Sequence, residues 1–217
     1  MLIRERMSKP VITIHPDLPM QDALNLMRKE HIRRLPVVNK LGRLVGIVSE
    51  GELLHASPSD ATSLSFYEVN YLLSKITVNE VMRKNVITVA EDTPLEEAAR
   101  IMADNKIGGL PVVRDNEVVG IITETDLFKI FLELLGAREP GIRVAALVPN
   151  VPDELNKLTQ AISKIGGNIL SFGTFLGNSS ENREVTFKVE GVDEQALKKS
   201  IEPFVERIVD LRETQFT

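Results

Sequence analysis

The sequence contains no cysteine and no tryptophan, only three histidines, and no apolar run long enough to span a bilayer. Without cysteine the chain can form no disulfide, thiolate nucleophile or zinc–thiolate site. His15, His31 and His55 are far apart and lack the spacing of metal ligands. We also find no nucleophile–base–acid arrangement and no signal-peptide core near Met1. We therefore expect a cytoplasmic protein that is not an enzyme and that binds neither a metal nor a membrane.

The chain also lacks an excess of positive charge. The chain has 26 basic and 31 acidic residues, giving a formal net charge of −5. Proteins that bind nucleic acids usually present a basic face, so nucleic acid is not an expected partner. At 217 residues, of which 43% are hydrophobic, the chain can form one large domain or two small ones, each with its own core.

What the sequence does contain is an internal repeat. Residues 7–38 and 82–113 align without a gap at an offset of 75 residues, and 14 of the 32 positions are identical. Each copy is predicted to run from a short strand through an amphipathic helix to two apolar strands joined by a turn. The predicted elements are strands at 11–14, 35–38 and 44–48 with a helical stripe from Met20 to Met27, and in the second copy a strand at 86–89 with a stripe from Leu95 to Met102.

Both copies close on the same phrase, at Gly46–Leu53 and at Gly120–Leu127. Each reads as a buried strand that ends in a hydroxyl residue, with a carboxylate three residues later at the start of a helix. The pairs are Ser49 with Glu52 and Thr123 with Asp126. Such a pair can cap the helix, or it can join the helix N-terminus in holding a phosphorylated sugar. The residues alone leave both uses open.

The C-terminal part has a different pattern, with the order βαββαβ that is typical of a ferredoxin-like fold. The predicted strands are 142–149, 168–175, 183–189 and 208–211, and the predicted helices are 153–165 and 197–204. Residues 66–75 predict a further helix, which either packs on its own repeat or contacts another subunit. We expect a protein of the α/β (α+β) class whose parts are the first repeat with its connecting helix (1–74), the second repeat (75–136), a linker (137–141) and a C-terminal domain (142–217).

These motifs carry a family resemblance. The repeated unit, with its Leu-Pro-Val-Val strand and its Gly-Ile-x-Ser/Thr-x-x-Glu/Asp phrase, resembles the CBS domain, and the tandem resembles a Bateman module with pseudo-two-fold symmetry. The C-terminal part, with Val151-Pro152-Asp153-Glu154-Leu155 and Gly166-Gly167-Asn168-Ile169-Leu170, is similar to an ACT domain. The order CBS–CBS–ACT resembles the AcuB-type acetoin utilisation regulatory proteins of bacteria.

This resemblance implies a homodimeric regulatory protein that binds an adenine nucleotide and relays its presence to a regulated partner, which the sequence does not identify. AMP and ATP are the first candidate ligands, and S-adenosylmethionine is another. In CBS pairs the hydroxyl of the closing phrase contacts phosphate and the carboxylate holds the ribose, and each cleft draws on both repeats.

The resemblance also assigns residues to the clefts. Thr123 with Asp126, and Ser49 with Glu52, would hold the phosphate and the ribose. The base would be lined by Ile47 and Ile121 and by the residues around the two Leu-Pro segments: Ile32, Arg33, Arg34 and Pro36 in one copy, and Ile107, Gly108, Gly109, Leu110 and Pro111 in the other. We favour the cleft of Thr123 and Asp126, because its aspartate matches the family and the glycines leave room at the entrance. Glu52 is one methylene longer, and Arg33 and Arg34 are bulky.

ACT domains that bind amino acids usually have glycine where this chain has Asp153. An acidic helix cap would account for Asp153, and we expect this domain mainly to pair subunits through an exposed sheet edge. The alternative function is an amino-acid sensor with vestigial CBS clefts. Its effector site would be Asn150, Val151, Pro152, Asp153 and Glu154.

Overall fold

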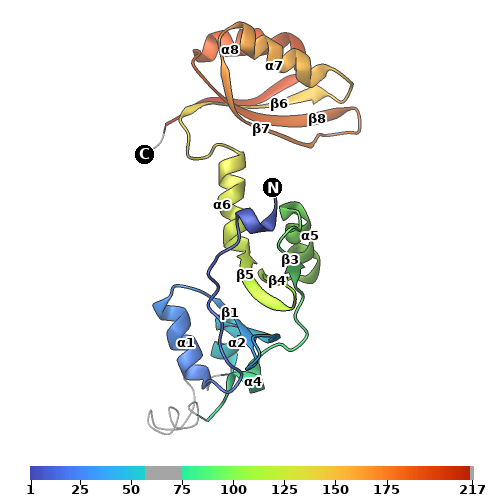
Figure 1. The fold of residues 1–217 in the computed structure, drawn as a ribbon. Coiled ribbons are helices and arrows are strands. Elements are labelled where there is room, and N and C mark those ends of the chain that lie inside the picture. Colours follow the sequence, from blue (N-terminus) through green and yellow to red (C-terminus); the bar gives the residue numbers. More distant parts are fainter. Residues whose placement is uncertain (57–74, 216–217) are drawn as a thin grey trace. The chain divides into compact units, whose positions relative to one another are not determined.

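The computed structural model describes residues 1–56 and 75–215 (Figure 1), which fall into two compact units, Met1–Leu127 and Phe128–Thr217. Most of the helix predicted at 66–75 lies outside the described residues. The first unit contains both repeats, and the second contains the C-terminal pattern.

The first repeat is a helix and a hairpin closed by a second helix. Its elements are α1 (Met20–Lys29), β1 (Arg34–Val38), β2 (Leu44–Ser49) and α2 (Glu50–His55), followed by the short α4 (Val78–Val81). The predicted stripe of α1 is confirmed, since Met20, Ala23, Leu24 and Met27 are its buried residues. They pack against Leu35, Val37 and Val48 of the hairpin to form one apolar core.

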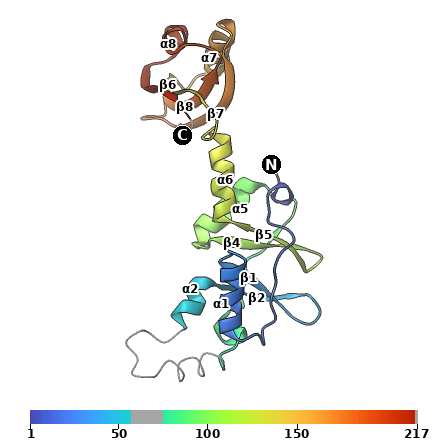
Figure 2. The same ribbon diagram turned by 90° about the vertical axis from the view of Figure 1, so that its left-hand side faces the viewer.

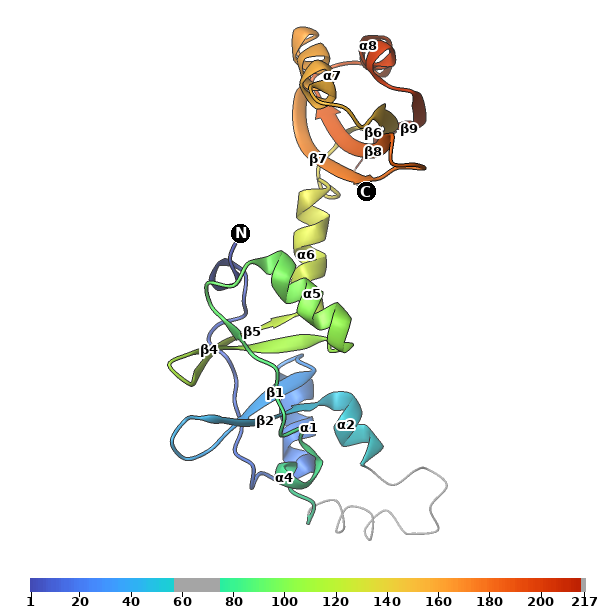
Figure 3. The same cartoon turned by 90° about the vertical axis from the view of Figure 1, so that its right-hand side faces the viewer.

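The second repeat has the same plan. A short 3₁₀ helix, η1 (Ile3–Glu5), lies at the chain's N-terminus, and the repeat itself consists of β3 (Val89–Ala90), α5 (Leu95–Asn105), β4 (Gly109–Arg114), β5 (Glu117–Thr123) and the start of α6 (Glu124–Leu134). Strand β3 is parallel to β4, and β4 is antiparallel to β5. Leu110 faces Ile122 across the hairpin as Leu35 faces Val48 in the first repeat. The loops of the two hairpins project on the same side of the unit (Figures 2 and 3).

The predicted strands at 11–14 and 86–89 were too long. In the first run only Ile14 forms a ladder contact: its N–H donates to Pro36 O at 3.1 Å, and its carbonyl accepts from Val38 N at 2.8 Å. Pro10 and Pro16 flank that run and cannot donate to a ladder. In the second copy the strand is the pair Val89–Ala90.

The segment that leads into each repeat pairs with the other repeat. Ile47 N donates to Arg83 O at 3.0 Å, and Arg83 N donates to Ile47 O at 2.9 Å. Ser8 and Ile121 exchange the equivalent bonds at 2.9 and 3.3 Å. The space between the two hairpins is therefore lined by residues of both repeats.

This exchange places a methionine over the glycine of each closing phrase. A Cβ atom at Gly46 would lie 3.0 Å from Cγ of Met82, 3.1 Å from the carbonyl oxygen of Arg83, and in overlap with Sδ of Met82. Met7 lies against Gly120 in the same way. We expect Gly46→Ala to lower the free energy of unfolding by roughly 1–3 kcal/mol, because a backbone carbonyl cannot retreat as a side chain can.

A matched control is Gly51→Ala in α2, where a new Cβ would meet no atom within 4 Å. That change is expected to be neutral or to stabilise by up to about 1 kcal/mol, since alanine is the better helix former. Urea denaturation followed by circular dichroism measures both. Equal midpoints for the two variants would show that the Gly46 contact is not tight.

The second unit has the predicted βαββαβ order. Its elements are β6 (Gly141–Pro149), α7 (Glu154–Lys164), β7 (Asn168–Leu176), β8 (Asn182–Glu190), α8 (Glu194–Ile201), the 3₁₀ helix η2 (Glu202–Phe204) and β9 (Arg207–Thr214). They form an antiparallel sheet in the order β7-β8-β6-β9, with both helices over one face (Figure 1). Phe187, Val144, Leu158 and Leu197 are buried between the sheet and the helices.

A buried lysine lies on β8, where it ties the segment after α6 to the sheet. Lys188 is 5% exposed, and its Nζ donates to the carbonyl oxygens of Gly136 and Glu139, both at 2.7 Å. Gly136 has a φ of +58°, the left-handed conformation expected of a residue that ends a helix. The ammonium therefore satisfies carbonyl groups next to the negative end of the α6 dipole.

Candidate functional site

The hydroxyl–carboxylate pair of the first repeat forms a complete capping box at the start of α2. Ser49 N and Ser49 Oγ both donate to Oε2 of Glu52 at 2.8 Å, and Glu52 N donates to Ser49 Oγ at 3.3 Å. The other carboxylate oxygen, Oε1, accepts from Nε of Arg83. The pair therefore caps the N-terminus of α2, and Glu52 also forms an ion pair with Arg83 of the second repeat.

The equivalent pair of the second repeat is less engaged. Thr123 N and Thr123 Oγ1 donate to Oδ2 of Asp126 at 2.9 and 2.7 Å. Within the part of the chain that the structure describes, Oδ1 of Asp126 makes no hydrogen bond and no ion pair.

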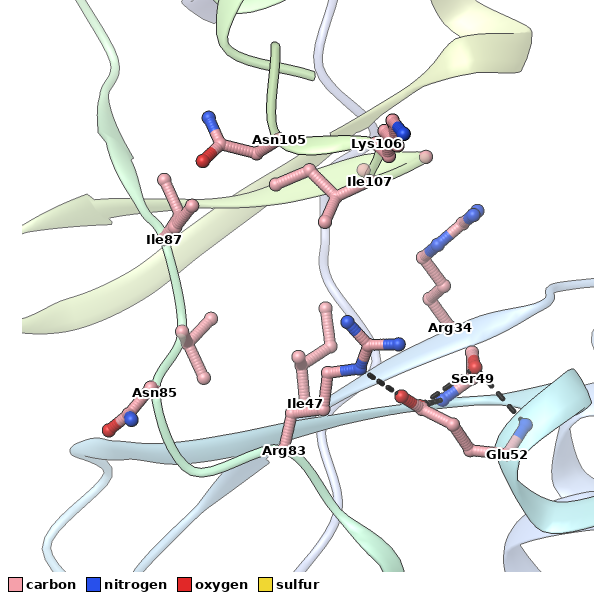
Figure 4. Close-up of a pocket in the computed structure, with 13 residues that line it drawn as sticks. Arg34, Ile47, Ser49, Glu52, Arg83, Asn85, Ile87, Asn105, Lys106 and Ile107 are labelled. Carbon is pink, nitrogen blue, oxygen red and sulfur yellow. Dashed lines mark hydrogen bonds and ion pairs between the residues drawn. The ribbon is translucent and has the colours of Figure 1, made fainter. Parts of the chain in front are cut away.

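A pocket of about 290 Å³ lies between the hairpins at Ser49 and Glu52 (Figure 4). Figure 4 shows Ile47, Ile87 and Ile107 extending into this space from three different segments of the chain. The lining residues come from both repeats: Arg34, Ile47, Ser49, Glu52, Arg83, Asn85, Val86, Ile87, Asn105, Lys106, Ile107, Gly108 and Gly109. The apolar residues can receive a flat ring, and the polar ones surround it.

The charges of this pocket are mostly positive. Arg34, Arg83 and Lys106 line it together with a single carboxylate, that of Glu52. Burial alone would raise the pKa of the Glu52 carboxyl, but the hydrogen bonds from Ser49 and Arg83 outweigh burial and hold that pKa below its usual value. Glu52 is therefore ionised at neutral pH and neutralises one of the three cations.

Arg34 occupies the space over the two glycines that were expected to leave room at an entrance. A Cβ at Gly108 would overlap the guanidinium of Arg34, and one at Gly109 would lie 3.2 Å from Cδ of Arg34. Nη2 of Arg34 is also 4.0 Å from Oε2 of Glu124, at the start of α6. The glycines thus allow an arginine of the first repeat to cross to the second.

The structure unites only some of the predicted site residues. Arg34, Ile47, Ser49, Glu52, Ile107, Gly108 and Gly109 line the pocket, whereas Ile32, Arg33, Pro36, Leu110, Pro111, Ile121, Thr123 and Asp126 do not. Leu110 is fully buried in its hairpin, and Pro36 and Pro111 are buried as well. The pocket is thus at the pair that the sequence ranked second, Ser49 and Glu52.

Sequence reasoning missed the wall formed by residues 83–87 and the end of α5 at Asn105 and Lys106. The internal repeat is the sequence feature that could have predicted these lining residues. Because the segment before each repeat pairs with the other repeat, Arg83 and its neighbours belong to the cleft of the first closing phrase.

The predicted effector segment of the second unit is bonded to its own neighbours. Asn150 donates from Nδ2 to Ser180 O and accepts from Arg183 Nε, both at 3.0 Å, and Glu154 accepts from Lys157 Nζ at 2.7 Å. Asp153 is the N-cap residue of α7 as expected, but its side chain accepts from Asn156 Nδ2 and makes no capping bond to a backbone N–H. Asp153 has a φ of +75°, a conformation that aspartate adopts more readily than most residues.

Two absences hold within residues 1–56 and 75–215. No group of three or more histidine or acidic side chains is arranged to hold a metal ion. In the same residues, no helix is both long and apolar enough to cross a membrane.

Comparison with known proteins identifies the family to which the two repeats belong. The family model of the CBS domain matches residues 3–59 and 78–133, which together are more than half of the chain. The chain belongs to the CBS domain family. Its CBS pair is 34% identical over 131 residues to the L-aspartate semialdehyde sulfurtransferase of Methanocaldococcus jannaschii. The aligned region is 60% of this chain but only 23% of the relative.

Many crystal structures resemble the CBS pair, and two of them serve as comparisons. One is the CBS domain pair of protein MJ0100 in complex with 5′-methylthioadenosine and S-adenosyl-L-methionine, with 34% identity, a TM-score of 0.51, and coverage of 60% of this chain and 95% of that one. The other is a Vibrio cholerae protein assigned to acetoin utilization (AcuB), with 34% identity, a TM-score of 0.53, and coverage of 64% of this chain and 96% of that one.

Proposed function

We propose that the CBS pair senses an adenine nucleotide of the AMP, ADP or ATP class in the pocket at Ser49 and Glu52. The observation that carries this proposal is the composition of the pocket, with Ile47, Ile87 and Ile107 for a flat base and three cations for phosphate. A planar base suits an apolar slot, and a phosphate suits arginine and lysine donors. The CBS pair of MJ0100 binds 5′-methylthioadenosine and S-adenosyl-L-methionine, which supports the adenosyl part of this ligand.

The charges favour a phosphorylated ligand over S-adenosylmethionine. Since Glu52 already pairs with Arg83, a sulfonium cation would meet the positive charges of Arg34 and Lys106, which the carboxylate of Glu124, 4.0 Å from Arg34, offsets only in part. Phosphate would instead replace the weak contact of Arg34 with Glu124, which is 4.0 Å long. Thr123 and Asp126 are proposed as a second, less favoured ligand position with Ile32, Arg33 and Ile121.

We also propose a role for the C-terminal domain and an assembly. Residues 142–217 would form an ACT domain, which the βαββαβ order and the sheet order β7-β8-β6-β9 support. Its edge strands β7 and β9 would pair two subunits, and both carry exposed apolar side chains, at Leu176 and Val209. The protein would act as a homodimeric regulator whose nucleotide-dependent state is recognised by a partner protein, with acetoin catabolism as the candidate process.

A thermal-shift screen of the full chain tests this function. AMP, ADP or ATP at a hundredfold excess over Kd should stabilise the protein by about 2.7 kcal/mol and raise Tm by several degrees. The shift should vanish in Gly108→Asp, which adds a carboxylate beside Arg34, and persist in Gln195→Asp, which adds a carboxylate at an exposed position of α8 in the other unit. Stabilisation by amino acids alone would contradict the proposal and support the amino-acid sensor. A preference for S-adenosylmethionine over AMP would contradict the phosphate argument.

A further inference from the structure

A second groove shares a wall with the candidate pocket. Along residues 83–88, Arg83, Asn85 and Ile87 line the pocket, while Lys84 and Thr88 line the second groove and Val86 contributes to both. Alternation of this kind is what an extended segment produces. The groove has a volume of about 310 Å³ and is lined by Arg43, Leu44, Lys84, Val86, Thr88, Val113 and Asn116.

The groove gathers hydrogen-bond donors from both hairpin loops. Arg43 lies at the loop between β1 and β2, and Asn116 at the loop between β4 and β5. A β-bridge between Arg43 and Glu117 joins these loops, which project on the same side of the unit (Figures 2 and 3). The groove is therefore a composite of both repeats, as the nucleotide pocket is.

Its polar side chains are unengaged. Among the described residues, the side chains of Arg43, Lys84, Thr88 and Asn116 make no hydrogen bond and no ion pair. Nearby arginines behave differently: Arg83 pairs with Glu52, and Arg114 lies 3.6 Å from Glu91. None of the described residues that line the groove is acidic, although acidic residues outnumber basic ones in the chain.

We propose that this groove binds a small phosphorylated molecule, separately from the nucleotide pocket. Two cations with a hydroxyl and an amide, unopposed by any carboxylate in the lining, are the donors that recognise a phosphate group. Leu44, Val86 and Val113 supply apolar surface for the carbon skeleton that carries the phosphate. The volume is that of a small-molecule site. The groove and the nucleotide pocket share no charged residue, so phosphate binding in the groove does not rest on the proposed nucleotide.

Titration calorimetry of the full chain with inorganic phosphate and with ribose 5-phosphate tests the groove. Both probes should bind, and the double variant Arg43→Gln/Lys84→Gln should weaken ribose 5-phosphate binding by at least about tenfold, since two charge-assisted contacts are lost. Lys40→Gln, an exposed lysine of the same loop outside the groove, should leave the affinity unchanged. Arg114→Gln, an exposed arginine that lines neither cavity, should also leave the affinity unchanged.

Amide NMR of the unaltered chain gives a measurement that does not depend on a variant folding. Ribose 5-phosphate should shift the amide signals of Thr88 and Asn116. Failure of both probes to bind, or equal affinity in the double variant, would overturn the proposal. Equal affinity in the double variant would place the phosphate outside the groove.

Discussion

Replacing Arg34 and Arg83 together by methionine is expected to weaken AMP binding by about 100-fold, because each charge-assisted hydrogen bond to a phosphate contributes about 1.5 kcal/mol or more. Both arginines line the pocket, one from each repeat. Methionine keeps much of the apolar stem, so the change isolates the charge. Titration calorimetry of the full chain with AMP measures the effect.

Adenosine is the informative control ligand, because it has the base and the ribose but no phosphate. Its affinity should change little in the double variant, and the release of Glu52 from Arg83 leaves that carboxylate available to the ribose hydroxyls. Arg114→Met, an exposed arginine paired with Glu91 outside the pocket, is the matched control variant. Equal losses of affinity for AMP and adenosine would contradict a phosphate role for the two arginines.

Lys188→Met is expected to destabilise the second unit by about 3 kcal/mol. The change removes two hydrogen bonds from a charged donor and leaves the carbonyl oxygens of Gly136 and Glu139 without that partner. The apolar stem of the side chain is retained, so loss of packing is small. Hydrogen exchange of the β8 amides in the full chain should show protection reduced by about 100-fold.

Lys198→Met provides the comparison, since Lys198 is an exposed lysine of α8. Its effect should stay within about 0.5 kcal/mol, as is usual for surface positions. If the two variants exchanged at the same rate, the contacts of Lys188 would not be holding the segment after α6 to the sheet.

The sequence was most informative where local pattern and tertiary packing agree. The helical stripe of α1, both hairpins and the βαββαβ order followed from hydrophobic periodicity and from turn residues. The repeat added that the two hairpins are equivalent, which the matching pairs Leu35–Val48 and Leu110–Ile122 confirm. The predicted strand boundaries were wrong mainly at the short first strand of each repeat. There, prolines and the hydrogen bonds between the two repeats determine the pairing.

The pocket was less predictable, because its walls depend on contacts between repeats. No local pattern indicates that Arg34 extends over Gly108, since only the folded unit brings the two together. The glycines were expected to leave an entrance open, whereas in the structure they accommodate Arg34. The left-handed conformation of Asp153 was likewise unforeseen, because glycine is the usual signal for a positive φ.

The most direct test of the nucleotide pocket is methyl NMR of the full chain during titration with AMP. Ile47, Ile87 and Ile107 line the pocket, whereas Ile142, Ile162 and Ile201 belong to the core of the other unit. We predict saturable shifts of the first three methyl signals and no shift of the other three. Shifts confined to the second unit, or none at millimolar AMP, would contradict the proposed function.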